Sequence, residues 1–347
     1  MPTYAALLRA SANRVYGAAS FALSAAELAV LDRTQLGSVL GAARPQAIGG
    51  VDYLVVDAAA VLDDHALAVL ANLSSLHALF ELVGDGLLRP CVVSPIARAD
   101  DDVVTIQRYA GKTNEAFTHL LVNLALAESG DAMARLLAGG RVQLLDPACG
   151  RGTSLNRAIV YGMDATGIEL DQRDVEAYTT FILTWLKDKR YKHDLQQAKL
   201  RRGRDTPAHR ITVTYGPGKD RTQHRVVDII HDDTLQARSH LRARSMDLLV
   251  CDLPYGVQHG ARPGDGRLER GPGGLLRAAL PVWFDVLRPG AAMALAWNRR
   301  TLPRPELAAL VGASGFELRA DVDDDSFVHR VDRSIQRDVL VAARPGR

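Results

Sequence analysis

The strongest constraint on the fold is an alternation, between residues 142 and 297, of short apolar runs with longer segments of helical spacing. The apolar runs have the length of strands and are expected at 142–145, 165–168, 226–230, 246–251 and 291–297. Helices are expected over 117–125, from about 154, at 174–186 and at 275–287. Strands that alternate with helices predict an α/β fold with a doubly wound, mostly parallel, Rossmann-like sheet. A last apolar run, at 338–342, is expected to add an edge strand.

The first 95 residues are expected to form a smaller α/β domain, and residues 96–347 the larger one. Strands are expected at 4–8 and 51–56. Ser24 and Glu27 have the spacing of a capping box, which predicts that a helix starts there. Residues 63–83 have helical spacing, and residues 94–102, with Pro95 and three aspartates, are expected to be the linker.

Composition narrows the class of protein. The chain has 347 residues, a net charge of +2 and three cysteines, too few and too scattered for a disulfide framework or a zinc site. It has no uninterrupted apolar stretch of about 20 residues and no evident secretory signal, so we expect no membrane span, no metal and a cytoplasmic location. Nothing in the sequence specifies an oligomeric state.

The segment 187–225 is locally basic and longer than a simple connection needs. It holds 12 Lys and Arg against 4 Asp and Glu, an excess of 12 − 4 = 8. Such a segment is expected either to contact phosphates or to be a solvated loop. Residues 211–215 and 225–228 flank Gly-Pro-Gly and are expected to form a hairpin that rises over the site.

The first chemical motif is the segment 144–153, Leu-Leu-Asp-Pro-Ala-Cys-Gly-Arg-Gly-Thr, in which a strand leads into a turn before a helix. Ligands of open α/β sheets bind beyond the carboxyl ends of the strands. Gly150 and Gly152 have no side chain, so the backbone can approach a ligand closely. No Gly-Lys-Ser/Thr follows, and Leu155 stands where a dinucleotide fingerprint has its third glycine. The turn therefore indicates a cofactor that carries no phosphate.

Two further strand ends carry acids. Glu169, followed by Leu170, ends the strand at 165–168, and a carboxylate there can accept hydrogen bonds from ribose hydroxyls. Asp232 and Asp233 follow the strand at 226–230, where a carboxylate can accept a hydrogen bond from an adenine amino group; we favour Asp232. Acids are also favoured at helix starts, so a capping role is the alternative at both places.

The fourth motif decides the interpretation. The strand at 246–251 runs into Asp252-Leu253-Pro254-Tyr255, which resembles the [D/N]-P-P-[Y/F] signature of class I amino-methyltransferases. The carboxylate of Asp252 and the peptide carbonyl of Leu253 can each accept one N–H bond from an amine that is a poor nucleophile. Pro254 stiffens the turn, and Tyr255 offers a ring on which a flat base can stack. Position 253 is Leu rather than Pro, but the accepting carbonyl is retained. The resemblance implies S-adenosylmethionine as the cofactor.

Residues from about 105 to 260 resemble the family that combines a THUMP-type RNA-binding region with a Rossmann-like tRNA guanine-N2 methyltransferase domain. The segment 108–114 looks like the one that packs beside the methionine end of the cofactor, which includes Thr113 and Asn114. The resemblance implies a cofactor site lined by Asp146, Cys149, Gly150, Gly152 and Thr153, with Glu169 on the ribose. It also implies that the first 95 residues are a reduced THUMP or ferredoxin-like region that binds RNA.

The sequence therefore predicts methyl transfer to an exocyclic amino group of a nucleobase, with guanine N2 in tRNA as the first choice of substrate. Three alternatives remain open. The target could be adenine N6 in DNA, or an amide or amine in a peptide or small metabolite. The chain could also be a module that binds the cofactor or RNA without turnover.

Overall fold

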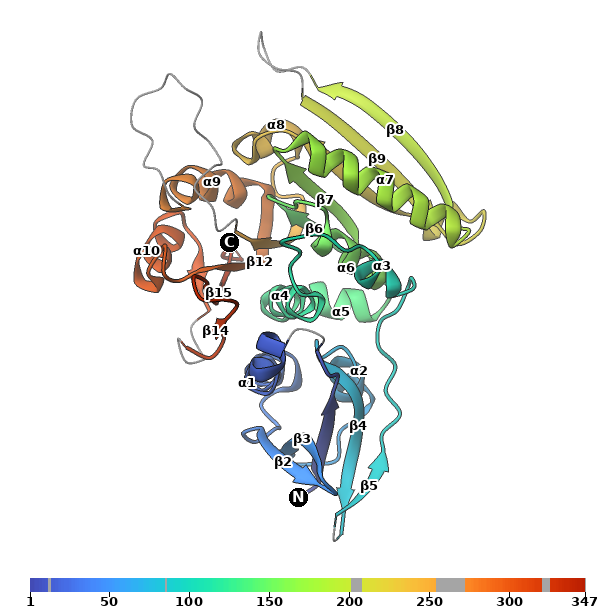
Figure 1. Ribbon diagram of the computed structural model, residues 1–347, viewed down its shortest axis with the longest axis vertical. Helices are drawn as coiled ribbons and strands as arrows, with labels where there is room; N and C mark the ends of the chain where they lie inside the picture. The colour runs from blue at the N-terminus through green and yellow to red at the C-terminus, as the bar shows by residue number, and fades with distance from the viewer. Residues whose placement is uncertain (12–13, 85, 201–207, 254–271, 320–324, 347) are drawn as a thin grey trace.

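The computed structural model describes residues 1–11, 14–84, 86–200, 208–253, 272–319 and 325–346 (Figure 1). These residues form two sheets, one of five strands and one of ten. Residues 254–271, which include Pro254 and Tyr255, lie outside the described residues.

The five-stranded sheet belongs to the N-terminal unit and is antiparallel, in the order β2-β3-β1-β4-β5. Its elements are β1 (Thr3–Leu8), α1 (Arg14–Leu31), the π-helix Asp32–Leu36, β2 (Arg44–Ile48), β3 (Val51–Asp57), α2 (Asp64–Leu70), β4 (Leu76–Val83) and β5 (Leu87–Pro90). The order β1-α1-β2-β3-α2-β4 is that of the ferredoxin-like motif, to which β5 adds a fifth strand.

Two sequence predictions in this unit are wrong. Ser24 and Glu27 lie in the middle of α1, not at its start. Both side chains are buried, and Glu27 accepts hydrogen bonds from Ser74 and Asn123, so its carboxylate makes tertiary contacts instead of capping a helix. Residues 63–83 are also not one helix, because α2 ends at Leu70 and the second half pairs with β1 as β4.

The stretch Val15–Leu36 is long and apolar enough to cross a membrane by length and composition. Half of its most apolar window is buried inside the fold. Glu27 in its middle bonds to two other elements, and Asp32 accepts hydrogen bonds from the backbone of Val39 and Leu40. These contacts are those of a core helix in this structure.

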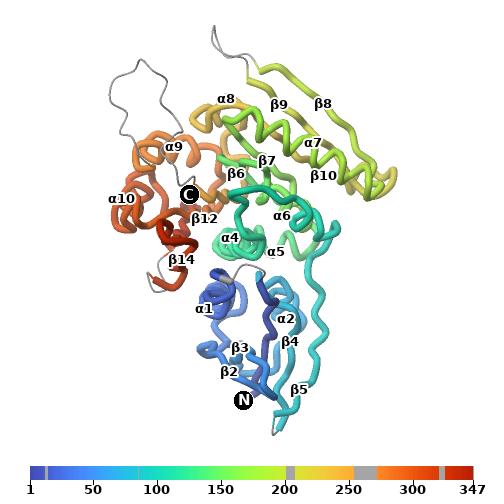
Figure 2. Tube along the Cα trace, viewed as in Figure 1, coloured from blue at the N-terminus to red at the C-terminus, as the bar shows by residue number. Residues whose placement is uncertain are grey.

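A connection without regular structure leads from β5 to the larger unit along one side of the molecule (Figure 2). It is attached to that unit, since the backbone N–H of Arg98 donates to the carbonyl of Val160 at 2.8 Å. Three helices then precede the large sheet: α3 (Asp102–Thr105), α4 (Glu115–Glu128) and α5 (Ala132–Leu137). Helix α4 lies between the two units and contacts α1 as well as β11, β12 and β15 of the large sheet (Figure 1).

The large sheet has the order β13-β15-β12-β11-β6-β7-β10-β9-β8, and β14 pairs with β15. Its parallel strands are β6 (Gln143–Asp146), β7 (Asp164–Glu169), β10 (Arg225–His231), β11 (Met246–Asp252) and β12 (Leu287–Asn298). Counted along the chain, these five strands lie in the order 3-2-1-4-5, as in a doubly wound Rossmann sheet. The predicted α/β class and the parallel, doubly wound centre of the sheet are confirmed, and antiparallel strands extend this centre on both sides.

Helices cover both faces of this sheet. Neighbouring residues of a strand point to opposite faces, so Leu144 joins the core under α4, α6 (Thr153–Tyr161) and α7 (Gln172–Asp188), whereas Leu145 joins the core on the other face. That second core contains α8 (Ala237–His240), α9 (Pro272–Val286) and α10 (Arg304–Ala313). Trp283 and Trp297 are both buried there.

The expected edge strand at 338–342 is β15 (Gln336–Ala343), which runs antiparallel to β12. It is not at the edge, because the short strands β13 (Glu317–Leu318) and β14 (His329–Arg330) pair with its outer side. This return of the chain brings residues from the last part of the sequence beside the ends of β11 and β12.

The basic segment, 187–225, forms strands over most of its described residues. Two strands, β8 (Lys192–Leu200) and β9 (Ala208–Gly216), pair with each other, and β9 pairs antiparallel with β10. The expected hairpin of β9 and β10 is thus present, but it does not rise over the site. Its connection, which includes the 3₁₀ helix Arg221–Gln223, precedes β10 and lies at the edge opposite to the carboxyl end of that strand.

Candidate active site

A cavity of about 410 Å³ lies at the point where the strand order of the large sheet reverses, between β6 and β11. This is the place where ligands bind in open α/β sheets. Most of its lining comes from three parts of the chain: the turn after β6, the end of β11 and the segment before α4. Helices α4 and α7 complete it with Thr118, Leu121 and Asp174. The three main parts contribute Asp146, Cys149, Gly150, Thr153, Asp252, Leu253, Tyr109 and Thr113.

Asp146 ends β6 and is buried. Its carboxylate accepts a hydrogen bond from the backbone N–H of Ala148 at 3.1 Å and another from the hydroxyl of Ser154. Burial raises the pKa of Asp146 to about 7, and the nearby charges of Glu169 and Asp252 add to the effect. The turn is therefore anchored by an acid whose charge is costly until a cation or donor approaches it.

The turn after β6 needs glycine at two positions, and the physical reason differs between them. Both have positive φ, +51° at Gly150 and +73° at Gly152. A Cβ at Gly150 would meet no atom within 4 Å, whereas a Cβ at Gly152 would lie 2.4 Å from the ring of Tyr178. Gly150 thus leaves space at the cavity, and Gly152 allows α6 to pack against α7.

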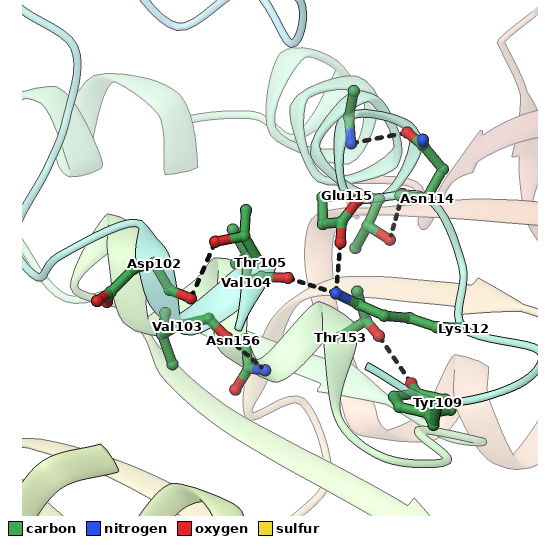
Figure 3. A network of polar contacts seen from close by, with 12 residues as sticks. Asp102, Val103, Val104, Thr105, Tyr109, Lys112, Asn114, Glu115, Thr153 and Asn156 are labelled. Atoms are coloured by element: carbon green, nitrogen blue, oxygen red, sulfur yellow. Dashed lines mark hydrogen bonds and ion pairs between the residues drawn. The ribbon is translucent and has the colours of Figure 1, made fainter. Parts of the chain in front are cut away.

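Cys149 and Thr153 complete the turn. The backbone N–H of Cys149 donates to the carbonyl of Ile168 at 3.0 Å, which ties the turn to β7, and burial raises the pKa of the Cys149 thiol. Thr153 begins α6, and its hydroxyl lies 3.0 Å from that of Tyr109 (Figure 3). The structure therefore brings the turn and the segment before α4 together.

Glu169 ends β7, and its carboxylate is hydrogen-bonded to the turn that follows β6. Its two carboxylate oxygens accept hydrogen bonds from the backbone N–H groups of Gly150 and Asp171, each at 2.8 Å. Each oxygen has a second lone pair, so these bonds leave acceptor capacity for ribose hydroxyls. Leu170 follows and is 47% exposed, beyond the residues that line the cavity.

Asp232 and Asp233 lie one strand further on, after β10. The backbone N–H of Asp232 donates to the carbonyl of Glu169 at 3.1 Å, so the two strand ends are neighbours. The carboxylate of Asp232 lies 2.6 Å from Nε2 of His240. Asp233 caps the 3₁₀ helix Thr234–Gln236 through the backbone N–H of Leu235, which is the capping role that the sequence left open.

Asp252 lies at the end of β11 and lines the cavity. Its Oδ2 accepts a hydrogen bond from the hydroxyl of Thr113 at 2.7 Å and from Nη2 of Arg337 at 3.1 Å. Leu253 also lines the cavity, although its side chain is buried and its backbone N–H donates to the carbonyl of Ala296 at 2.8 Å. The carboxylate of Asp252 thus lines the cavity, and its hydrogen bonds with Thr113 and Arg337 fix its orientation.

The segment before α4 separates this cavity from a larger cleft. Thr113 lines both, whereas Asn114 lines only the cleft and caps α4 through the backbone N–H groups of Ala116 and Phe117. Lys112 points away from the cavity, toward the carbonyl of Val104 at 2.6 Å and the carboxylate of Glu115 (Figure 3). A cofactor contact of Asn114 therefore stays a prediction.

Arg337 is the residue of this site that the sequence did not indicate. It belongs to β15, is buried, and lies over the ring of Phe117 at 4.6 Å from the ring centre. Its position 85 residues after Asp252 has no local signal, and only the antiparallel pairing of β15 with β12 brings it to the end of β11.

Among the described residues, no group of three or more His, Cys, Asp or Glu side chains is arranged to hold a metal ion. The arrangement instead offers a cavity lined by three carboxylates, those of Asp146, Asp174 and Asp252, and by hydroxyl groups, with further acids at the neighbouring strand ends. Such a set suits a ligand that is cationic and rich in hydroxyl and amino donors.

No family model matches the chain, and no curated protein matches its sequence. Solved structures resemble its fold. TrmN from Thermus thermophilus is 13% identical over 99% of this chain and 100% of its own, with a TM-score of 0.44. A TehB-like SAM-dependent methyltransferase from Corynebacterium glutamicum is 14% identical over 61% and 86%, with a TM-score of 0.33. A SAM-dependent methyltransferase from Methanosarcina mazei is 15% identical over 58% and 92%, with a TM-score of 0.35.

Proposed function

We propose that this chain is an S-adenosylmethionine-dependent methyltransferase that methylates an exocyclic amino group of a nucleobase, with guanine N2 in tRNA as the first candidate. The observation that carries the proposal is the position of Asp252. It lies at the switch point of a doubly wound sheet and lines one cavity together with Asp146 and Gly150.

The residues present fit the cofactor. The space beside Gly150 admits a ligand against the backbone, and Asp146 offers a buried carboxylate to a positively charged group. Glu169 would accept hydrogen bonds from the ribose, and Asp232, its neighbour in the sheet, from the adenine amino group. When bound, S-adenosylmethionine supplies a methyl group on a positively charged sulfur.

The chain's own contribution to the reaction is to orient the accepting nitrogen. The carboxylate of Asp252 and the carbonyl of Leu253 would each accept one N–H bond of the amine, which aims its lone pair and favours the positive charge that develops on nitrogen. Alignment of this kind supplies a large part of the acceleration of a two-substrate reaction. Arg337 and Thr113 hold Asp252 in one orientation. Pro254 and Tyr255 keep their predicted roles outside the described residues.

A nucleic acid is the favoured substrate because the locally basic segment 187–225 forms strands that extend the sheet beside the site; within β8 and β9 it places Lys192, Lys199 and Arg210 against one acid, Asp194. His231 at the end of β10 pairs in register with Glu169 on one side and with His209 of β9 on the other. The basic ribbon of β8 and β9 therefore starts at the same edge of the sheet as the cofactor site, and every residue from Lys192 to Lys199 is exposed. A tRNA substrate and a cytoplasmic location belong to this proposal.

Two variants of Asp252 test the proposal. We expect Asp252→Ala to keep the affinity for S-adenosylhomocysteine in calorimetry and to lose methyl transfer to total tRNA by about 100-fold or more, the loss typical of a missing transition-state contact. Asp252→Asn retains an accepting oxygen and should lose less. The matched control is Asp188→Asn, at the exposed end of α7. Unchanged transfer by Asp252→Ala would refute the role of this acid.

A further inference from the structure

A second cavity, a cleft of about 900 Å³, lies between the N-terminal unit and the large unit. One wall comes from the turns at the top of the first sheet, and the other comes from the connection to α3 and from helices α4 and α6. Thr113 lines both the cleft and the cavity that holds Asp252. A ligand in the cleft would therefore lie next to the proposed methyl-transfer site.

Arg157, on α6, lines this cleft and is the unusual residue in it. It is only 9% exposed, and its Nε has no hydrogen-bond partner among the described residues. Its guanidinium makes no ion pair with any described carboxylate, and its one ring contact is with Tyr161, 5.9 Å from the ring centre. A buried guanidinium without a counter-charge is costly, so its presence indicates that an anion completes the site.

The other basic side chains around the cleft are mostly neutralised within the protein. Lys112 pairs with Glu115, and Lys189 lies 2.9 Å from Asp100. Lys189 also pairs with the neighbouring Asp102, and Arg9 lies 3.9 Å from Asp101. These pairs leave Arg157 without a carboxylate in direct contact, and the nearest acids, Asp101 and Glu115, act on its charge only at longer range and are themselves paired with Arg9 and Lys112.

Two more groups shape the local charge. His119 lies next to Tyr161, and burial together with the charge of Arg157 lowers its pKa well below the usual value, so it is neutral. Arg98, at the exposed rim, also makes no ion pair with a described carboxylate. The cleft lining therefore contains one buried arginine, Arg157, and one exposed arginine, Arg98, whose guanidinium extends toward Gly139.

We propose that this cleft binds a phosphate group of the nucleic-acid substrate, with Arg157 as the buried contact and Arg98 at the rim. Guanidinium groups match phosphate oxygens through paired hydrogen bonds. A volume of about 900 Å³ leaves room for a stretch of sugar-phosphate backbone around that contact. Phosphate contacts set the position of a nucleic acid, so binding here would deliver the target base past Thr113 to the cavity. The phosphate chemistry follows from the cleft alone; its source in a nucleic acid rests on the proposed function.

The test uses the full chain, the variant Arg157→Gln, and Arg89→Gln as a matched control at an exposed arginine of β5. Inorganic phosphate is titrated first, with thermal unfolding as the readout. Phosphate that binds the folded protein stabilises it against unfolding. It should therefore raise the melting temperature of the wild type and the control, but not that of Arg157→Gln, which lacks the buried contact. Equal stabilisation of all three proteins, or of none, would overturn the phosphate site.

Binding of total tRNA at several salt concentrations then identifies the source of the phosphate. Arg157→Gln should weaken tRNA binding about 10-fold and reduce the slope of log affinity against log salt by about 1, with the affinity for S-adenosylhomocysteine unchanged. If phosphate protects in an Arg157-dependent way but tRNA affinity does not change, the cleft binds a small phosphate compound and the nucleic-acid assignment is wrong.

The same experiment separates this inference from the proposed function. If the wild type transfers no methyl group to any nucleic acid, the proposed function fails. The phosphate titration still tests whether the cleft binds phosphate. If Arg157→Gln does not fold, Arg98→Gln replaces it, with the same expected directions and a smaller loss of tRNA affinity because Arg98 is exposed.

Discussion

Arg337 donates a hydrogen bond to the carboxylate of Asp252 at 3.1 Å across 85 residues of sequence. The pair joins the last long strand of the sheet to the residue on which the proposed reaction depends. Because a cation and the hydroxyl of Thr113 both approach Oδ2, the carboxylate has a fixed orientation toward the cavity. We interpret Arg337 as a positioning residue that acts through Asp252.

Replacement of Arg337 by Gln should lower kcat for methyl transfer by about 10- to 100-fold, since a displacement of about 1 Å can cost 100-fold. The affinity for S-adenosylhomocysteine should be retained. The control is Arg304→Gln, which breaks the ion pair of Arg304 with the buried Asp338, one residue along the same strand. Both variants should lose stability, but only Arg337→Gln should lose activity per folded molecule. Equal kcat in the two variants would contradict a positioning role.

Cofactor affinity should depend on pH through Asp146. Burial raises the pKa of this acid to about 7, so it gains its charge between about pH 6 and 8. A cationic cofactor prefers the ionised form, and its affinity should therefore rise as pH rises through this window. Asp146→Asn should bind more weakly and with a flatter pH profile, as measured by calorimetry. A steep profile retained in the variant would assign the titration to another group.

Glu27 should make the stability of the fold depend on pH. Burial raises the pKa of this acid from 4.5 to about 7, so the folded chain holds the proton more tightly than the unfolded chain does. The contribution of this group is fully present below about pH 4.5 and is lost as pH rises through about 7, roughly 1 to 3 kcal/mol in all.

Replacement of Glu27 by Gln tests this prediction. An amide can still accept from Asn123 and Ser74, so the variant should fold and should gain stability relative to the wild type as pH rises from 4.5 to 7. Urea unfolding at several pH values measures the difference. Asp146 titrates in the same range, so Asp146→Asn is the comparison that leaves the contribution of Glu27 in place. Parallel pH profiles of wild type and Glu27→Gln would refute the assignment.

The two glycines of the turn after β6 should respond differently to alanine. Both substitutions place a side chain at positive φ, at a cost of about 1–2 kcal/mol. Gly152→Ala also drives a Cβ into the ring of Tyr178 and should cost about 1–3 kcal/mol more. Gly150→Ala should instead weaken cofactor binding, because its Cβ points into open space at the cavity. Thermal unfolding and calorimetry distinguish them, and a similar loss of stability in both would contradict the geometry.

The strand ends of the large sheet were predictable because their signals are local. An apolar run followed by an acid or a glycine marks a strand and the loop at its carboxyl end, and parallel strands bring those loops to one edge. Asp146, Glu169, Asp232 and Asp252 were found in this way, and the structure places them at neighbouring strand ends. What these side chains do for a ligand stays a prediction.

The features that the sequence did not reveal depend on distant contacts. Strand β8 has no apolar alternation and becomes a strand only by pairing with β9. Glu27 looked like part of a capping box, yet burial against Asn123 makes it a core residue of α1. The roles proposed for Arg337 and Arg157 depend on their surroundings in the fold. Arg337 pairs with Asp252, whereas Arg157 is buried without a paired carboxylate.

The most direct test of the central claim is the transfer of labelled methyl from S-adenosylmethionine to total tRNA, DNA and protein, followed by analysis of the modified nucleosides. We expect label in tRNA, in a guanosine methylated at N2, and we expect this label to be lost with Asp252→Ala. Label in DNA adenine or in protein, with none in tRNA, would contradict the substrate. No transfer to any of the three, together with no binding of the cofactor in calorimetry, would contradict the claim itself.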